Sequence, residues 1–223
     1  MAVRQARLAF VGTSHAASHL RAAAVEKDFQ IVGPRDANVV FISEDTPIAA
    51  DGTRDETPIR ALVDTAAALH ATLVITSQVT PGFTRSLGLH CYCQTETLRM
   101  KDAEERARKP EMLIVGCEDT GIPLPEEYAE YLSAFNCPIL KMTWEEAELS
   151  KIAFNMALAM QVDYANRMKA ACDKIGADWD VVKHVVHGDK RIGKWAYLDP
   201  GRWQDSPHLL RDAVTLKAIE DAH

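Results

Sequence analysis

Short apolar runs recur through the first two thirds of the chain, and most are closed by Gly, Pro or a polar residue. Continuous apolar runs of this length are typical of strands buried on both faces of a sheet. Residues 15–27 and 57–70, which lie between such runs, have helical composition or periodicity, and so do residues 125–135. Strands that alternate with helices indicate an α/β domain built on a parallel sheet. The strands are predicted at residues 8–11, 29–32, 38–43, 72–76, 112–117 and 138–142, and residues 92–107 stay ambiguous.

From Glu145 onward the pattern is helical throughout. It predicts one helix over residues 145–175, stopped by Gly176, and another over residues 179–187. A last helix should run from Ser206 to about Ala222, with Ser206 as its cap and Pro207 at its first position. We therefore predict an α/β domain over residues 1–143 and an all-helical domain over residues 144–223. A helix of this length exceeds what one small core needs, so we expect a homodimer formed through it.

Composition narrows the classes of partner. The net charge of −7 argues against a nucleic-acid backbone. No apolar run is long enough to span a membrane, and the N-terminus leads directly into a strand pattern rather than a signal peptide. The 5 cysteines have no framework spacing, which indicates reduced thiols and a cytoplasmic chain. Cys91 and Cys93 are interpreted as packing residues, so no metal site is expected.

Lys151 and Asn155 carry the most specific chemical pattern in the sequence. Four residues apart on a helix, they share one face. An ammonium and an amide presented together can stabilise an oxygen that gains charge during a reaction. A surface pair on a long helix is the alternative interpretation.

The segment AELSKIAFN around this pair, together with GDKRIG and PGRWQDSPHLLRD further on, resembles the nucleotide-sugar 6-dehydrogenases, the UDP-glucose and GDP-mannose dehydrogenases. DANVVFISEDTP and LVITSQVTPGFT in the first half are similar to that family as well. The resemblance implies a Rossmann-like NAD-binding domain, here trimmed, followed by a helical dimerisation domain. It implies oxidation of a sugar C6 alcohol to a carboxylate with NAD. The family's third domain, which binds the substrate's nucleotide, is expected to be absent.

The same resemblance assigns roles to individual residues. Lys151 and Asn155 would stabilise an alkoxide, Asp212 would set the charge of Lys151, and Glu96 would position a water molecule. Residues 12–14 of the glycine turn, together with Ser77 and Gln78 in the segment beside the nicotinamide, would hold the cofactor. Arg191 would reach the sugar in a neighbouring subunit, and Arg211 replaces a lysine. The resulting sets are Lys151, Asn155, Asp212, Glu96 and His208 as catalytic candidates, Gly12, Thr13, Ser14, Ser77 and Gln78 for the cofactor, and Arg191 and Arg211 for the substrate.

Each of these residues also has an ordinary structural interpretation. Glu96 could be solvated, Asp212 could pair with Arg211 or Lys217, and Gly12 could be a turn glycine of any α/β fold.

The chain departs from the family pattern at several positions. His208 stands where the family has its catalytic cysteine, and imidazole does not replace a thiolate that must form a thioester. It could serve as a general base or be a solvated residue. The phosphate turn GTSHAA keeps only the first glycine, Gly12, of GxGxxG. No acidic residue closes the second strand, since Asp36 belongs to the approach to the third. Trp203, Asp205 and Ser206 occupy positions of family glycines.

Three hypotheses follow from this pattern. The first is a two-electron NAD-dependent oxidoreductase that acts on a sugar or small alcohol. The second is a pseudoenzyme, a non-catalytic scaffold, sensor or regulatory homodimer. The third is a binding site in which Arg191, Lys151 and Arg211 hold a nucleotide sugar or another anionic small molecule.

Overall fold

The computed structural model describes residues 5–49, 53–99 and 101–222. The chain forms two compact units, Met1–Lys151 and Ile152–His223. The first unit is a sheet with helices on its faces. Its strands are β1 (Arg7–Val11), β2 (Gln30–Ile31), β3 (Val39–Ile42), β4 (Thr72–Ile75), β5 (Tyr92–Thr95), β6 (Leu113–Cys117) and β7 (Ile139–Thr143). Its helices are α1 (His15–Glu26), η1 (Pro34–Asp36), α2 (Thr57–Ala66), α3 (Phe83–Ser86), α4 (Ala103–Arg108), α5 (Glu126–Ser133) and the first two turns of α6 (Trp144–Ile175).

The sheet has the order β2-β1-β3-β4-β5-β6-β7. All neighbouring strands run parallel except β5 and β6, where Cys93 lies opposite Gly116 in an antiparallel pair. The predicted class is confirmed: this is a Rossmann-like, mostly parallel sheet followed by a helical region. The chain crosses from one side of β1 to the other between β2 and β3, so the carboxyl ends of β1 and β3 form the topological switch point of the sheet.

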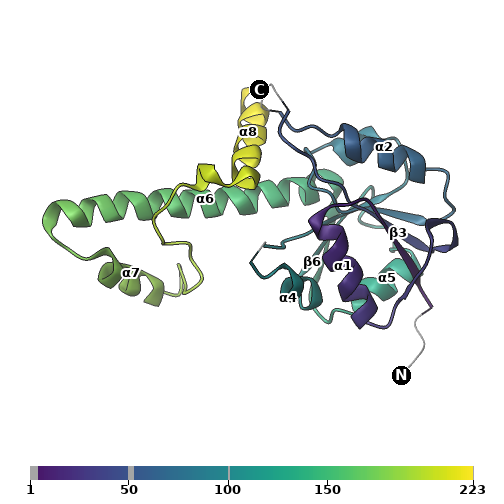
Figure 1. The fold of residues 1–223 in the computed structure, drawn as a ribbon, viewed down its shortest axis with the longest axis horizontal. Helices are drawn as coiled ribbons and strands as arrows, with labels where there is room; N and C mark the ends of the chain where they lie inside the picture. The colour runs from purple at the N-terminus through teal and green to yellow at the C-terminus, as the bar shows by residue number, and fades with distance from the viewer. Residues whose placement is uncertain (1–4, 50–52, 100, 223) are drawn as a thin grey trace. The chain divides into compact units, whose positions relative to one another are not determined.

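Alternate residues of each strand enter two separate cores. Leu8, Val39 and Phe41 pack under α1, α4 and α5, while Ala9, Val40 and Ile42 pack under α2, α3 and the start of α6. Figure 1 shows α1 and α5 on one face of the sheet and α2 on the other. Because both faces are buried, these strands contain continuous apolar runs rather than alternating ones.

Several local details differ from the prediction. The helix predicted over residues 57–70 ends at Ala66, and a turn follows in which Leu69 N–H donates to Ala66 O. The ambiguous segment contains both β5 and α4. β5 and β6 are neighbours and run antiparallel, an arrangement that the apolar pattern alone does not indicate.

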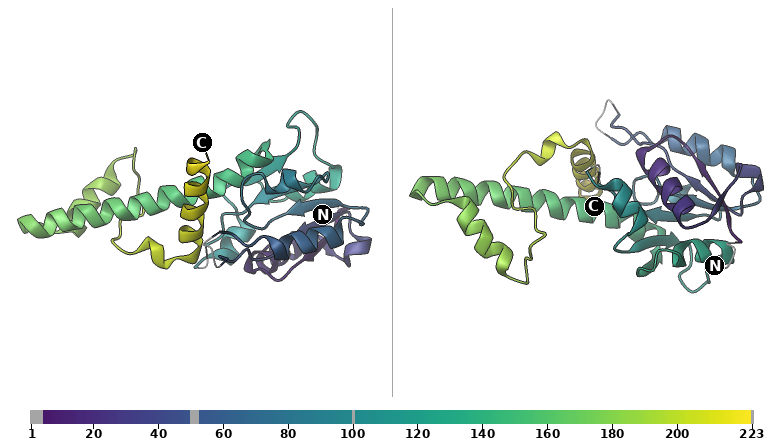
Figure 2. Two further views of the ribbon diagram at one scale, coloured as in Figure 1. Left: turned by 90° about the horizontal axis from the view of Figure 1, so that it is seen from above. Right: turned by 60° about the horizontal axis from the view of Figure 1, so that its bottom comes forward.

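The second unit is helical. It contains the remainder of α6, then α7 (Trp179–Gly188), η2 (Trp203–Asp205) and α8 (Pro207–Asp221). Ser206 caps α8 with its side chain, and Pro207 is the first helical residue, as predicted. α7 folds back beside α6 (Figure 2), where Trp179 packs against Ala165 and Cys172 and donates its indole N–H to Leu198 O at 3.0 Å. Within the residues that the structure describes, no helix is both long and apolar enough to cross a bilayer.

Candidate functional site

The turn after β1 lies at the switch point, directly beside the end of β3. Gly12 has a φ of +102°, which favours glycine. A Cβ on Gly12 would come within 2.0 Å of Ser43 O, so a larger residue would separate the turn from β3. This glycine therefore has a packing role in the apposition of two strand ends. That role does not depend on any ligand.

Ser14 stands where a GxGxxG turn would have its second glycine, and its side chain is buried. Its Oγ accepts the N–H of Ala17 at 3.1 Å and lies 2.6 Å from Ser43 Oγ. The hydroxyl thus caps α1 and binds the end of β3 at the same time. Both interactions hold the residue at the second-glycine position of the motif against the end of β3.

Glu44, the second residue after β3, binds the turn after β1 through its carboxylate. Its carboxylate accepts the N–H of Thr13 at 3.1 Å and the hydroxyl of Thr13 at 2.9 Å. Ser77, at the end of β4, fastens the Glu44 backbone: its Oγ accepts the Glu44 N–H at 2.7 Å and donates to the Glu44 carbonyl at 2.8 Å. Glu44 therefore links two residues, Thr13 and Ser77, that the sequence assigned to the cofactor.

This arrangement differs from a dinucleotide-binding turn in what its backbone N–H groups bind. A helix N-terminus binds phosphate through free backbone N–H groups and a local positive potential. Here the N–H of Thr13 donates to a carboxylate, and Ser14 carries a side chain where the motif has a glycine. The Glu44 carboxylate also places a negative charge beside this turn. β2 ends at Ile31, and the next acidic residue, Asp36, belongs to η1 and lines a surface pocket together with Val11 and Gly33.

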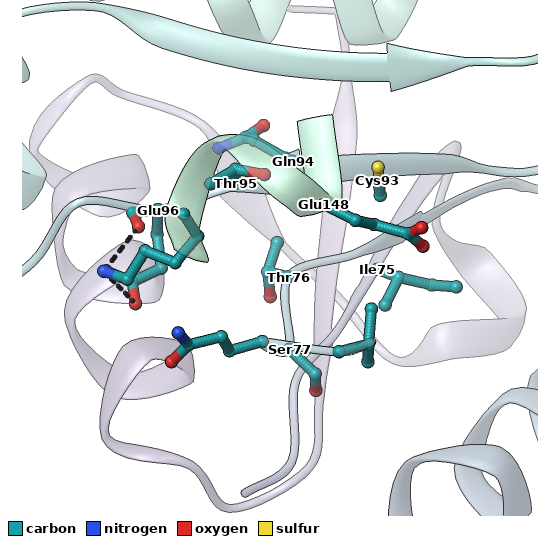
Figure 3. A pocket seen from close by; sticks show the side chains of 11 residues that line it. Ile75, Thr76, Ser77, Cys93, Gln94, Thr95, Glu96 and Glu148 are labelled. Atoms are coloured by element: carbon teal, nitrogen blue, oxygen red, sulfur yellow. Dashed lines mark hydrogen bonds and ion pairs between the residues drawn. The ribbon is translucent and has the colours of Figure 1, made fainter. Parts of the chain in front are cut away.

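A small pocket lies at the carboxyl ends of β4 and β5 and is closed by the first turns of α6. Its volume is about 20 Å³, enough for roughly one water molecule. Figure 3 shows Glu96 and Glu148 entering it from opposite sides, with Thr76 and Ser77 between them. Gln78 also lines this pocket, and its backbone carbonyl accepts from Arg54 Nη1 at 2.7 Å.

Lys151 forms one wall of this pocket and is only 8% exposed. Its Nζ donates to the Glu96 carbonyl at 3.0 Å and lies 3.6 Å from Glu96 Oε1 (dashed lines in Figure 3). The structure thus brings together two of the predicted catalytic residues. The Glu96 carboxylate also accepts the N–H of Leu98, which fixes its own loop.

Glu148, which the sequence analysis did not single out, is a buried acid of the same pocket. It accepts the N–H groups of Gly82 at 2.6 Å and Thr84 at 2.9 Å, and so holds the start of α3 against α6. Burial raises the pKa of this carboxyl group above its usual value, although the two N–H groups act in the opposite direction. Its position three residues before Lys151, on one helix face, is the sequence signal that identifies it.

The second unit holds the other predicted catalytic residues. Asn155 donates its amide N–H to Asp212 Oδ2 at 2.7 Å, and both side chains are buried. In α8, Arg211 Nη2 lies 3.5 Å from His208 Nδ1. Arg191 joins neither pair: its side chain is 89% exposed and binds Asp189 at 2.6 Å. The described residues contain no group of three or more His, Cys, Asp or Glu side chains that could hold a metal ion.

Comparison with known proteins places these residues in a family. Residues 145–220, which include Lys151, Asn155 and Asp212, match the central domain of the UDP-glucose/GDP-mannose dehydrogenase family. The chain is 31% identical over 181 residues to a UDP-glucose 6-dehydrogenase of Pseudomonas aeruginosa, a match that covers 72% of this chain and 40% of that protein. It is 27% identical over 179 residues to a UDP-glucose 6-dehydrogenase of Bacillus subtilis, with the same coverage of 72% and 40%. The chain thus spans well under half the length of these relatives.

Solved structures support the same fold. A UDP-glucose dehydrogenase from Pyrobaculum islandicum superposes with a TM-score of 0.71 at 20% identity, over 98% of this chain and 69% of that one. A GDP-mannose dehydrogenase from Pseudomonas aeruginosa superposes with a TM-score of 0.70 at 20% identity, over 87% and 60% of the two chains. The sequence match over the Lys/Asn helix and the shared fold lead to one conclusion: this chain is a divergent member of the UDP-glucose/GDP-mannose dehydrogenase family.

Proposed function

We propose that this protein is a non-catalytic member of its family, a homodimeric scaffold, sensor or regulatory subunit that does not use NAD. The observation that carries the proposal is the position of Glu44. Its carboxylate binds the N–H and the hydroxyl of Thr13, in the turn where a dinucleotide would place its phosphates.

Binding of NAD would bring its phosphates close to this carboxylate. Two unit charges of the same sign 4 Å apart repel by about 4 kcal/mol at the effective dielectric of a protein surface. A bound pyrophosphate would therefore either tolerate this repulsion or expel Glu44 and break both of its bonds to Thr13. Ser77 opposes the second course, because it fastens the Glu44 backbone with two hydrogen bonds.

Position 208 supports the same proposal. The four-electron oxidation that the family resemblance implies requires a thiolate that forms a thioester with the substrate, and this chain has His208 there. A neutral imidazole is a weaker carbonyl nucleophile, and its adduct would be unstable. The neighbouring Arg211 guanidinium, 3.5 Å from His208 Nδ1, also disfavours the positive charge that an imidazole would acquire after attack.

The homodimer is proposed from an exposed stripe on α6. Phe154, Met160 and Tyr164 are 42%, 72% and 41% exposed, and exposed Ala157 lies between the first two. These residues are three or four positions apart, so they share one face of the helix. A contiguous exposed apolar stripe on a long helix is typical of a surface that packs against another protein. A second copy of the chain would supply a matching stripe through a two-fold axis.

Calorimetry with NAD and with UDP-glucose on the purified protein tests the proposal. We expect no NAD binding at millimolar concentration, while the protein remains folded and dimeric. Saturable NAD binding, or NADH formation with any nucleotide sugar that is abolished by Lys151→Ala, would overturn it.

A two-electron NAD-dependent oxidoreductase is the second candidate. It is favoured by the retained Lys151–Glu96 pair at the pocket and by the retained Asn155–Asp212 pair. Its test is turnover with a panel of nucleotide sugars and small alcohols. The decisive control is Lys169→Ala, which removes an exposed lysine of the same helix that pairs with Asp173. Turnover that survives Lys169→Ala and is lost in Lys151→Ala would establish the enzyme.

A further inference from the structure

Two imidazoles face each other on the first turns of α1. His15 is the first residue of the helix, and His19 follows one turn later. The two Nε2 atoms are 3.3 Å apart, and the ring centroids are 4.3 Å apart with planes inclined by 32°. Both residues are half-buried.

We propose that His15 and His19 form a two-imidazole chelate for a divalent transition-metal ion, with Zn²⁺ as the ion of reference. Zn–N bonds are about 2.0–2.1 Å long, and two nitrogens on a tetrahedral ion are therefore roughly 3.3 Å apart. The separation of the two Nε2 atoms matches this spacing. Imidazole is a preferred ligand of Zn²⁺, Ni²⁺ and Cu²⁺, and His residues four apart on a helix face are a recurrent pair of zinc ligands.

The same distance allows a hydrogen bond in the absence of metal, in which one Nε2 carries the proton and the other accepts it. A metal ion takes the lone pairs of both Nε2 atoms. The donor ring must then carry its proton on Nδ1, so that both rings bind the ion through Nε2. The ring centroids are 4.3 Å apart, so each ring turns about its side-chain bonds to aim its Nε2 lone pair at the ion.

Charge at the start of the helix decides whether a cation is tolerated. The N-terminus of a helix carries a partial positive charge, which opposes a cation. The Glu44 carboxylate, bound to Thr13 two residues before His15, supplies negative charge at the same end. Glu44 thus acts in opposite directions on two ligands: it disfavours a phosphate at this turn and favours a metal ion.

The coordination would be incomplete from protein groups alone. Over residues 5–49, 53–99 and 101–222 no third His, Cys, Asp or Glu joins the pair within metal-binding geometry. The remaining positions would hold water or an exchangeable anion. The site is therefore an open one, with lower affinity than the four-ligand sites that stabilise folds.

Zn²⁺ titration of the chelator-treated full chain by calorimetry tests the proposal, with Co²⁺ as a spectroscopic probe. We expect one Zn²⁺ per chain at this site and at least a ten-fold loss of affinity in both His15→Ala and His19→Ala. Alanine favours helix, so neither variant should unfold α1, and circular dichroism checks this. The matched control is the double variant His184→Ala/His187→Ala, which removes the two histidines of α7 and should leave the affinity unchanged.

Three results would overturn the proposal. The first is wild-type protein that binds no Zn²⁺. The second is Zn²⁺ binding that neither α1 variant weakens. The third is a thiolate-to-Co²⁺ charge-transfer band as the only signal, which would assign the ion to one of the five cysteines instead. Because none of these measurements involves NAD, failure here leaves the proposed function untouched.

Discussion

Asn155 of α6 donates its amide N–H to Asp212 of α8 across 2.7 Å, and the Asp212 side chain has no exposed surface. The pair links two helices of the second unit that are separated by 57 positions in the chain. A buried carboxyl group requires its hydrogen-bond donors, because water cannot replace them. Whatever chemistry this pair retains, it contributes to the folding of the helical unit.

Replacement of Asn155 by alanine should destabilise the helical unit. Asp212 then loses a donor, and a buried hydrogen bond to an acidic group contributes about 2 kcal/mol. Urea denaturation followed by circular dichroism measures the change. Gln204→Ala, at an exposed position between α7 and α8, should change stability by less than about 0.5 kcal/mol. Equal losses in the two variants would refute a structural role for the pair.

Removal of the Glu44 charge should open the turn after β1 to anions. Glu44→Gln combined with Ser14→Gly removes the negative charge beside the Thr13 N–H and restores the missing glycine of the turn. We expect measurable binding of inorganic pyrophosphate by calorimetry where the wild type shows none. Asp45→Asn combined with Ser14→Gly removes one charge from the exposed neighbouring acid and serves as the control. Equal binding by the two double variants would show that net charge, rather than Glu44, governs the turn.

Gly116→Ala should strain the contact between the sheet and α6. The added Cβ would lie 2.3 Å from Cys93 Sγ and 2.8 Å from Ala147 Cβ. Overpacking of this kind costs about 1–3 kcal/mol. The double variant Gly116→Ala/Cys93→Ala removes the closest clash and should recover part of the loss. Gly201→Ala, where a Cβ would meet nothing within 4 Å, is the control for a glycine-to-alanine change.

Glu148 should make stability fall as pH rises through the mildly acidic range. Burial raises its folded-state pKa above the ordinary value of 4.5, so the folded state binds its proton more tightly than the unfolded state does. Below pH 4.5 both states are protonated at this group. Above it the unfolded state ionises first, and the free energy of unfolding declines until the raised folded-state pKa is passed.

The variant Glu148→Gln isolates this contribution, because it stays neutral over the whole range. Relative to the variant, the wild type should lose stability from pH 4.5 upward. Urea denaturation at several pH values between 4 and 7 measures the difference. A wild type that instead gains stability over this interval would mean that the N–H groups of Gly82 and Thr84 outweigh the effect of burial.

A charge in the apolar stripe of α6 should dissociate the proposed dimer. Met160→Asp places a carboxylate at the most exposed apolar position of the stripe, and burial of that charge against a second copy is costly. Analytical ultracentrifugation should show a monomer for this variant and a dimer for the wild type. Ala170→Asp adds the same charge at an exposed position of α6 outside the stripe and should remain dimeric. A wild-type monomer would refute the dimer itself.

The sequence predicted the elements that follow from a local pattern, such as an apolar run, a helix cap or a helical spacing. Val39–Ile42 forms a buried strand because both of its neighbours are strands and both faces are covered, and its uninterrupted apolar run reflects this. Ser206 and Pro207 mark the start of α8 through cap chemistry alone. The Lys151/Asn155 spacing indicated a shared helix face, and both side chains are buried.

Features that depend on distant segments could not be predicted in this way. Glu44 is an unremarkable acid in the sequence, and its importance arises only when β1, β3 and β4 bring Thr13 and Ser77 to it. The partners of Lys151 and Asn155 come from 55 and 57 positions away. The antiparallel β5–β6 pair was missed because four residues, YCQT, are too few to reveal direction.

Glu44 can also be regarded as a tethered competitor. A group held on the same chain acts at an effective concentration in the millimolar range or above, and dilution of the protein does not lower it. A soluble nucleotide of equal intrinsic affinity would have to exceed that concentration before it occupied the turn after β1. In the proposed non-catalytic protein, the turn would therefore keep one conformation whatever the ratio of NAD to NADH.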